Sequence, residues 1–515
     1  MKLRHLVPAL LLASSLPAWA DDAPAKDAAK PSMDYTKPTL STTSGSVSIG
    51  GEKISYKANA GTLVLKDDKN EPAVSMFYVY YAKDGAPSNR PVTFFFNGGP
   101  GSATVWLHMG AFGPQRVRTA DDTHTPGAPY ALVNNEDSLL DVTDEVFIDA
   151  PGTGFSRVID KDLGGKADPK DYYGVDQDAK AFTNFVQLFL SKYSRWNSPK
   201  YIFGESYGTI RGPLLAEGLQ NAAVDINGLI LLSAIPNTDI SADGDSLNPA
   251  IDIPFALVLP TQAAIAWYHD KIPNKPAKLE DFLAQVEKFA MGDYLTALNA
   301  GSTLDAATKQ KIAQQLSAYT GLSANYWMTA NLRVNGGQFE HELFRDSDKL
   351  AGRLDGRFSG YALDPLGEQA EYDPQSSSIS SAYVSLFNDY VRKTLNYGAD
   401  LSYIPLSGSV NQGWDFKHAN PFGQAFPGAT NVLPDLAVTM GQNPTMKVLL
   451  AGGYYDLATA FYGAQFQMQH LPMDDKLQAN ISYAWYPSGH MVYANEASAK
   501  KLHDDVAKFI ESSHK

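Results

Sequence analysis

Residues 201–208 read Tyr-Ile-Phe-Gly-Glu-Ser-Tyr-Gly, and this stretch indicates which kind of sheet the chain builds. Three strand-forming residues lead into a G-x-S-x-G motif at 204–208, and a helical pattern follows directly. Glycines on both sides permit a sharp turn from strand to helix, which would present the hydroxyl of Ser206 at the edge of a sheet. A bare G-x-S-x-G also fits a simple turn, but its position between a strand and a helix favours a serine nucleophile.

The chain on either side of this motif repeats the alternation of strand and helix. Apolar strands are expected at residues 92–96, 145–148, 201–203, 229–232, 447–450 and 482–485, and helices at 176–193, 207–220 and 496–512. Such alternation produces βαβ units and a parallel sheet. Earlier runs such as 74–81 are separated by turn clusters and indicate antiparallel strands. We therefore expect an α/β fold with a central, mostly parallel sheet, N-terminal antiparallel strands and an inserted helical cap.

The first twenty residues have a different character from the rest. Lys2 and Arg4 precede a short apolar stretch at 6–16 that ends in Ala18-Trp19-Ala20. This pattern predicts a signal peptide cleaved after Ala20, because the apolar stretch is too short to span a bilayer comfortably; a retained anchor is the alternative. The boundaries that we expect are a signal peptide at 1–20, a flexible leader at 21–44, the α/β domain at 45–234 and 440–515, and a mostly helical cap insertion at 235–439.

Composition excludes several classes of protein. The 515 residues include 42 Lys+Arg against 56 Asp+Glu, a formal charge of -14 that disfavours nucleic-acid binding. Cysteine is absent, so the chain has no disulfide, no thiolate nucleophile and no Cys-based zinc site. Past residue 20 no apolar run is long enough to cross a membrane, so no membrane association is expected after signal cleavage. A signal peptide without cysteines fits a periplasmic or secreted protein, and we expect a bacterial one.

A serine nucleophile needs a base and an acid that orients it, in the order Ser, Asp or Glu, His for this type of sheet. His490 is the best candidate base, because it lies on a loop after the strand at 482–485. Asp456 follows the strand at 447–450 and is the candidate acid. Asp435 and Asp474 are alternatives that follow no comparably clear strand.

The glycine-rich turn Asn97-Gly98-Gly99-Pro100-Gly101-Ser102 follows the strand at 92–96. A turn at this place could supply backbone N–H groups to a developing oxyanion. The competing interpretation is a phosphate-binding loop, but the sequence has neither a following Gly-Lys-Ser/Thr nor a G-x-G-x-x-G pattern. Metal-ligand spacing is also missing, since Glu340-His341-Glu342 is not H-E-x-x-H, and no cofactor or metal is expected.

Four motifs together resemble the serine carboxypeptidase family of α/β-hydrolases, peptidase family S10. They are Asn97-Gly98-Gly99-Pro100-Gly101-Ser102, Asp149-Ala150-Pro151-Gly152-Thr153-Gly154-Phe155-Ser156, Gly204-Glu205-Ser206-Tyr207-Gly208 and Gly489-His490-Met491-Val492. The motifs occur in the family's order, and the resemblance spans about residue 91 to the C-terminus. Tyr493 departs from the pattern, because the family usually has proline there.

The resemblance implies a set of roles for this chain. Ser206 would be the nucleophile, His490 the base and later the acid, and Asp456 the residue that orients it. The backbone N–H groups of Gly99 and Tyr207 would form the oxyanion hole. Asn97 and Glu205 would bind the free carboxylate of a peptide substrate.

An ionised Glu205 would repel both that carboxylate and the oxyanion, so the two carboxyl groups should share a proton. We therefore expect activity to favour acidic pH. A structural ion pair between Glu205 and a cation such as Arg211 is the alternative.

The sequence is compatible with three functions. The first is a periplasmic or secreted carboxypeptidase that acts through an acyl-enzyme without a cofactor. The second is an esterase or acyltransferase on the same scaffold, and the third is a catalytically silent binding protein, which fold alone would permit.

Overall fold

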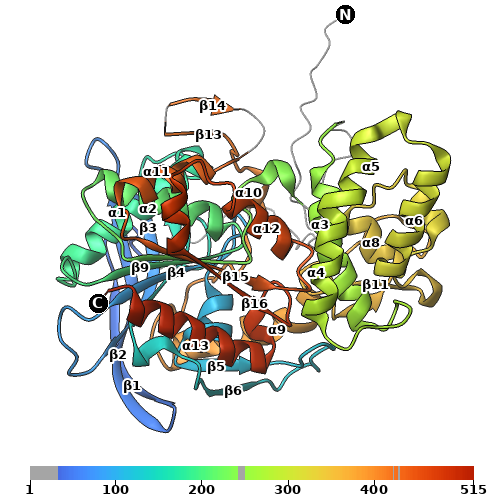
Figure 1. The fold of residues 1–515 in the computed structure, drawn as a ribbon. Coiled ribbons are helices and arrows are strands. Elements are labelled where there is room, and N and C mark those ends of the chain that lie inside the picture. Colours follow the sequence, from blue (N-terminus) through green and yellow to red (C-terminus); the bar gives the residue numbers. More distant parts are fainter. Residues whose placement is uncertain (1–32, 242–249, 422, 427–429, 515) are drawn as a thin grey trace, which may run out of the picture.

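A single large sheet organises the chain (Figure 1). The computed structural model describes residues 33–241, 250–421, 423–426 and 430–514, so the expected signal peptide lies outside the described residues. Nine of the ten strands follow the order β1-β2-β3-β7-β4-β9-β10-β15-β16, and β8 pairs with β3. Their bounds are β1 (Leu40–Ile49), β2 (Glu52–Lys66), β3 (Pro72–Lys83), β4 (Val92–Phe96), β7 (Asp144–Ile148), β8 (Arg157–Val158), β9 (Lys200–Glu205), β10 (Gly228–Leu232), β15 (Lys447–Gly453) and β16 (Ile481–Tyr486).

The sheet has a parallel part and an antiparallel part. Strands β7, β4, β9, β10, β15 and β16 pair in parallel. Strands β1, β2, β3 and β8 pair in antiparallel fashion, and β3 joins the two parts by pairing antiparallel with β7. The carboxyl ends of parallel strands meet at one edge of a sheet, which is where α/β proteins bind their ligands.

Helices cover both faces of this sheet, so the molecule has three layers there. Along β4, Phe94 and Phe96 join the apolar cluster on one face and Phe95 joins the cluster on the other, as a strand's alternation requires. The first face packs against α1 (Val175–Lys192), α2 (Gly208–Asn221), α11 (Leu433–Gln442) and α12 (Phe461–Met468). The second packs against α9 (Pro374–Lys393) and α13 (Glu496–Ser512), which lie below the sheet in Figure 1.

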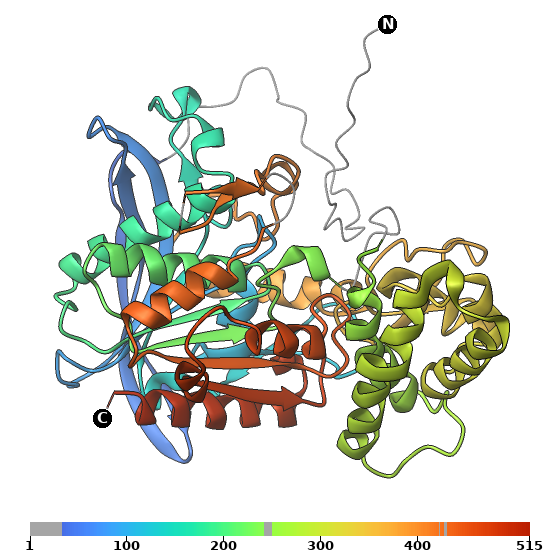
Figure 2. The same ribbon diagram turned by 45° about the horizontal axis from the view of Figure 1, so that its top comes forward.

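The segment expected as one helical cap, 235–439, divides between two places. Its first half forms a separate helical bundle with its own apolar cluster, at the right of Figure 2. The bundle contains α3 (Ile253–Tyr268), α4 (Leu279–Phe289), α5 (Leu295–Ala300), α6 (Ala306–Thr320), α7 (Ala324–Thr329) and α8 (Gly336–Glu342). Helices α9 and α11 instead pack on the sheet, so the segment contributes to the main core as well.

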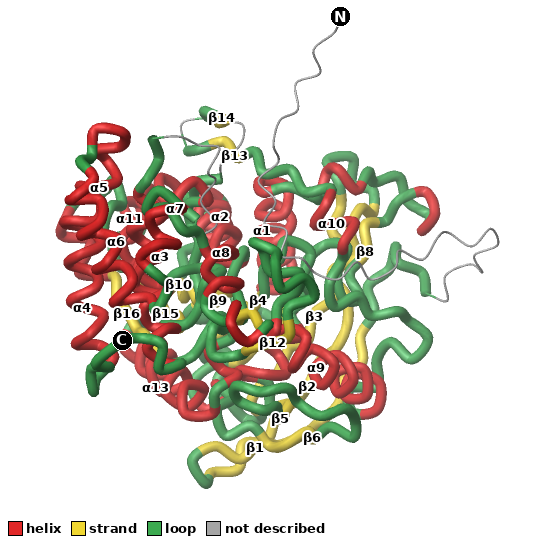
Figure 3. The backbone as a smooth tube through the Cα atoms, turned by 90° about the vertical axis from the view of Figure 1, so that its right-hand side faces the viewer, coloured by secondary structure: helices red, strands yellow, loops and turns green. Residues whose placement is uncertain are grey.

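Smaller elements complete the structure. Three two-stranded sheets are β5 (Gln115–Arg118) with β6 (Ala131–Asn134), β11 (Lys349–Ala351) with β12 (Ser359–Tyr361), and β13 (His418–Ala419) with β14 (Ala425–Phe426). Helix α10 (Gly408–Gln412) precedes β13. Figure 3 views the molecule from the side of the helical bundle, whose helices stand in front of the strands of the main sheet.

The expected flexible leader at 21–44 is too long at its C-terminal end. Residues 40–44 belong to β1, which pairs with β2. The first pair in this ladder is Leu40 with Gly61. The Ser- and Thr-rich composition resembled a solvated tail, but threonine suits a strand and the backbone groups are satisfied by the ladder with β2. Tyr35, five residues earlier, is already buried.

Candidate active site

Ser206 lies in the turn between β9 and α2. Its φ is +61°, the left-handed conformation that a sharp strand-to-helix turn imposes. A Cβ on Gly204 would lie 2.2 Å from the backbone oxygen of Gly208, so only glycine permits this turn. The Ser206 side chain is neither fully buried nor exposed, and it therefore stays within reach of a ligand.

His490 and Asp456 are in direct contact. The Nδ1 of His490 lies 2.8 Å from Oδ2 of Asp456, and both side chains are buried. The Asp456 carboxylate also accepts hydrogen bonds from the backbone N–H of Ala458 (2.9 Å) and from the backbone N–H (3.0 Å) and hydroxyl (2.6 Å) of Thr459. These donors fix the carboxylate, which in turn fixes the orientation of the imidazole ring.

The end of β10 connects the serine turn with the histidine loop. The N–H of Ser206 donates to the backbone oxygen of Leu232 at 3.0 Å. The hydroxyl of the next residue, Ser233, donates to the backbone oxygen of His490 at 2.7 Å. Two consecutive residues thus hold both loops in a fixed relation.

Burial pulls the pKa of His490 down, but the charge and hydrogen bond of Asp456 and the charge of Glu205 raise it, and the net shift is upward. An imidazole held in this way is a stronger base than a free one. It can accept a proton from a neighbouring hydroxyl and return it to a leaving group.

The glycine-rich turn lies against the serine turn. A Cβ on Gly98 would lie 2.3 Å from the backbone nitrogen of Tyr207, so a side chain there would push the two loops apart. Within the described part of the chain, neither the amide of Gly99 nor that of Tyr207 donates a hydrogen bond. Two free N–H groups on adjoining loops are what an oxyanion hole requires.

The motif at 149–156 braces the glycine-rich turn. Asp149 accepts a hydrogen bond from the backbone N–H of Thr104 at 2.9 Å, and the Thr104 hydroxyl donates to the backbone oxygen of Ile148. Burial raises the pKa of Asp149 to about 6. The strand end and motif at 148–156 therefore hold Thr104, which follows the glycine-rich turn, in place.

Glu205 is buried beside the serine, and its carboxyl faces a tyrosine. The hydroxyl of Tyr493 donates to both carboxyl oxygens, at 2.9 Å and 3.2 Å. Burial is the largest influence on Glu205 and raises its pKa to about 7, although His490, Tyr493 and Asn97 act in the opposite direction. Oδ1 of Asn97 accepts the N–H of Leu107 at 3.0 Å, which leaves the amide NH2 of Asn97 to face Glu205.

The alternative role of Glu205, an ion pair with Arg211, is wrong. Arg211 pairs instead with Asp178, at 2.6 Å, and both side chains are fully buried. The Nη1 of Arg211 also donates to the backbone oxygen of Asn97 at 2.8 Å. Arg211 thus connects α2 to the glycine-rich turn, a link that the sequence analysis missed.

The other acidic candidates lie in unrelated contacts. Asp435 approaches Nε2 of His418 at 3.1 Å, and Asp474 caps a short helical turn by accepting the N–H of Lys476 at 2.9 Å. Only Asp456, of the three candidate acids, contacts His490. Asp456 and His490 of the expected set are therefore in contact, whereas Asp435 and Asp474 are not part of it.

Asp355 and Arg357 approach the histidine loop from the segment after the helical bundle. Asp355 accepts the N–H of Gly489 at 3.2 Å and binds Arg357 at 2.6 Å. The N–H of His490 donates to the backbone oxygen of Leu354 at 2.6 Å. No local pattern marks these residues, because their contacts join positions more than 130 residues apart.

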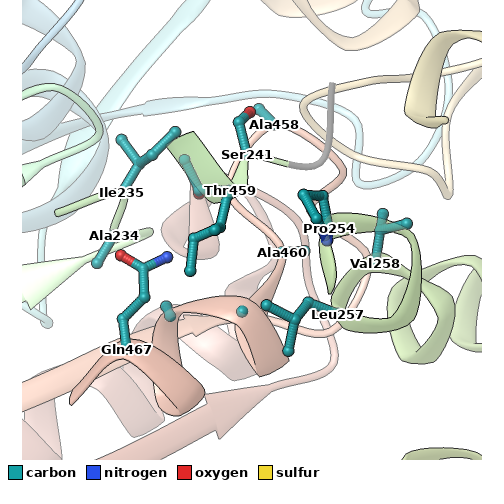
Figure 4. Close-up of a pocket in the computed structure, with 13 residues that line it drawn as sticks. Ala234, Ile235, Ser241, Pro254, Leu257, Val258, Ala458, Thr459, Ala460 and Gln467 are labelled. Atoms are coloured by element: carbon teal, nitrogen blue, oxygen red, sulfur yellow. The ribbon is translucent and has the colours of Figure 1, made fainter. Parts of the chain in front are cut away.

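A small cavity adjoins the Asp456 loop on the side of α3 (Figure 4). Thr459, which hydrogen-bonds Asp456, forms part of its wall, and Ile235 faces it from the end of β10. The lining is mostly aliphatic, with Ser241 and Gln467 as further polar members. The cavity lies where the helical bundle meets the sheet.

Comparisons with known proteins agree with this geometry. A family model described as serine carboxypeptidase matches residues 51–495. Serine carboxypeptidase S10 family member 1 of Dictyostelium discoideum is 29% identical over 165 residues, which cover 30% of this chain and 36% of that protein. Serine carboxypeptidase-like 2 of Arabidopsis thaliana is 26% identical over 188 residues, which cover 35% of this chain and 40% of that protein. The chain thus matches less than half of the length of each of these relatives.

A solved structure resembles the whole fold. The prohormone-processing carboxypeptidase of Saccharomyces cerevisiae matches with a TM-score of 0.53 and 16% identity, covering 88% of this chain and 91% of the other. The expected fold class, an α/β-hydrolase with a mixed sheet between helices, is therefore confirmed. Among the described residues no helix has the length and hydrophobicity to cross a membrane, and no group of three or more His, Asp or Glu could hold a metal ion.

Proposed function

The chain belongs to the serine carboxypeptidase family, and on that premise we propose that it is a serine-type carboxypeptidase that hydrolyses C-terminal residues from peptides through an acyl-enzyme. The observation that carries this proposal is the position of Glu205, a buried carboxyl with a pKa raised to about 7 directly beside the nucleophile. Esterases need no acid at this place, whereas an enzyme that binds a free carboxylate gains from one that can hold a proton.

In the proposed reaction the hydroxyl oxygen of Ser206 attacks the last peptide carbonyl. His490 takes the hydroxyl proton through Nε2, because Asp456 occupies its Nδ1 side. The N–H groups of Gly99 and Tyr207 stabilise the oxyanion. His490 then protonates the leaving amine, and a water molecule that it activates hydrolyses the acyl-enzyme.

Asn97 and Glu205 bind the substrate's free carboxylate in this proposal. The amide NH2 of Asn97 and the protonated form of Glu205 each donate a hydrogen bond to it. Both groups are buried, so the pairing takes place in a medium of low dielectric constant, where a charge-assisted hydrogen bond is strong.

Hydrolysis of an N-blocked dipeptide tests the function, with a simple ester as the second substrate and Ser206→Ala as the control. The proposal expects release of the C-terminal amino acid by the wild-type protein and none by the variant. Cleavage of the ester alone would favour an esterase or acyltransferase instead. Mass spectrometry after fluorophosphonate treatment identifies a catalytically silent protein, because only a working nucleophile becomes labelled.

The location and partners form part of the same proposal. Lys2 and Arg4 before a short apolar stretch support export to the periplasm or secretion. The acidic charge of -14 supports a peptide rather than a nucleic acid as the partner.

A further inference from the structure

Tyr493 lies three residues after His490 in a short helical turn, Val492–Ala494, and its side chain is 2% exposed. Its hydroxyl donates to both oxygens of Glu205. The ring has room because Gly110 faces it, where a Cβ would lie 2.6 Å from the Tyr493 ring. A buried tyrosine from the loop that carries His490 therefore contacts the acid directly.

The hydroxyl of Tyr493 keeps its proton throughout the working pH range. Burial, followed by the charge of Glu205, raises the pKa of Tyr493 well above its usual value. The amide of Asn97 faces the same hydroxyl oxygen and acts in the opposite direction. Asn97, Tyr493 and Glu205 thus form a chain in which each group has a donor directed at the next.

Other titratable groups also face Glu205. His490 comes from the loop after β16, Asp456 from the loop after β15, and Tyr383 from α9. The charge of His490 favours an ionised Glu205, whereas that of Asp456 opposes it. Among the described groups around Glu205, only Tyr493 donates to both of its oxygens.

We propose that Tyr493 is a positioning residue for Glu205, which fixes the acid for a substrate's free carboxylate and so sets the selectivity for peptides with a free C-terminus. The Tyr493 hydroxyl donates its proton to Glu205, and its oxygen faces the amide of Asn97. Protonated Glu205 can therefore donate its own proton in a hydrogen bond to the substrate's carboxylate. The proposal rests on the carboxypeptidase function proposed above.

Tyr493→Phe tests the proposal, because it removes the hydroxyl and keeps the ring. The substrates are an N-blocked dipeptide with a free C-terminus and its methyl ester, which lacks the negative charge. We expect kcat/KM for the free acid at pH 5 to fall about tenfold, mainly through KM, with little change for the ester. The pH at which free-acid hydrolysis declines should rise by about one unit, since a lost donor leaves Glu205 protonated to higher pH.

The matched control is Tyr383→Phe, which removes another buried tyrosine hydroxyl near Gly110. In Tyr383→Phe, free-acid hydrolysis should decline at the same pH as in the wild-type protein. The positioning role would be overturned if Tyr493→Phe lowered kcat/KM equally for both substrates. It would also be overturned if free-acid hydrolysis declined at the same pH in the variant as in the wild-type protein. The proposed function would then still stand if the wild-type protein hydrolyses the free acid, and it would fail if the wild-type protein does not.

A second variant covers the case in which Tyr493→Phe does not fold. Incorporation of 3-fluorotyrosine at position 493 keeps the shape and makes the hydroxyl a stronger donor. The decline in free-acid hydrolysis should then move to lower pH, opposite to the shift in Tyr493→Phe. A decline that stays in place would count against the proposal.

Discussion

Glu205 is the residue on which the proposed substrate selectivity depends most directly. A buried carboxyl next to a serine turn costs free energy when ionised, because burial penalises the charged form. The neighbouring donors reduce this penalty without removing it, and the pKa stays at about 7. Glu205 can therefore change its protonation state within the range in which many enzymes work.

The Glu205→Gln variant should lose the decline of activity at neutral pH. In the wild-type protein, kcat/KM for a free-acid peptide should fall by about fivefold between pH 7 and 8, because ionised Glu205 repels the substrate carboxylate. The variant keeps a donor at every pH, so only the acidic limb set by His490 should remain. A pH profile of kcat/KM from 4.5 to 8.5 measures this, and an unchanged neutral decline in Glu205→Gln would remove Glu205 from carboxylate binding.

Sequence patterns could identify the residues at loop ends but not those that support them. Ser206, Asp456 and His490 each follow a recognisable strand, and the last two are in contact in the structure. Tyr493 reaches Glu205 across 288 positions of sequence, and no local rule connects such residues. In the sequence Tyr493 stands out only as a departure from a family pattern, and that departure does not indicate Glu205 as its partner.

At the scale of elements, the histidine loop depends on a segment from outside the main sheet. Asp355 and Leu354 accept the backbone N–H groups of Gly489 and His490, and Arg357 donates to the hydroxyl of Ser488. Asp355 and Arg357 form a buried ion pair, and a broken pair of this kind leaves a charge without its partner. The loop at 354–357 thus couples the position of the base to the packing of the inserted segment.

Asp355→Asn should lower kcat by about tenfold or more and reduce the free energy of unfolding by about 3–5 kcal/mol, since Arg357 loses its buried partner. Steady-state kinetics and thermal unfolding measure the two effects. The matched control is Asp121→Asn, which removes the exposed partner of Arg357 and leaves the contact with Gly489 intact. If both variants had the same kcat, Asp355 would have no part in positioning the loop.

The elements themselves were largely predictable, whereas their packing partners were not. The expected strand at 92–96 has those bounds in β4, and α13 spans 496–512 as expected. Periodicity identifies an apolar face but does not say which surface covers it. Helices α9 and α11 were therefore assigned to a cap, although they pack on the sheet.

At the scale of the whole molecule, a charged cluster joins parts of the chain that lie far apart in sequence. His418 of β13 contacts Asp176 of α1 at 2.6 Å and Asp435 of α11 at 3.1 Å. Burial lowers the pKa of His418, but the two carboxylates outweigh it and raise the pKa to about 9. Nearby, burial raises the pKa of Glu217 to about 7.

The stability of the protein should decrease from pH 6 to pH 9.5. The folded state holds the His418 proton more tightly than the unfolded chain does, so this contribution is complete below about 6.5 and disappears as the pH passes about 9. Glu217 acts in the same direction between about 4.5 and 7, because its ionised form is unfavourable when buried. Thermal unfolding measures the difference in Tm between the two pH values.

His418→Gln should reduce this difference by about 2 °C or more, whatever its effect on stability at a single pH. An equal difference in the wild-type protein and the variant would show that other groups cause the pH dependence.

The order of the strands in the sheet is a second property of the whole molecule that the sequence did not reveal. β7 lies between β3 and β4, and this crossover depends on packing rather than on any local signal.

The most direct test of the central claim compares an N-blocked dipeptide with its C-terminal amide at pH 5 and pH 7.5, with Ser206→Ala as the control. Glu205 and Asn97 should favour the free acid by at least about tenfold in kcat/KM at pH 5 and by less at pH 7.5, and Ser206→Ala should release nothing. Equal hydrolysis of acid and amide at both pH values, or release by Ser206→Ala, would contradict a serine carboxypeptidase that recognises a free C-terminus through Glu205.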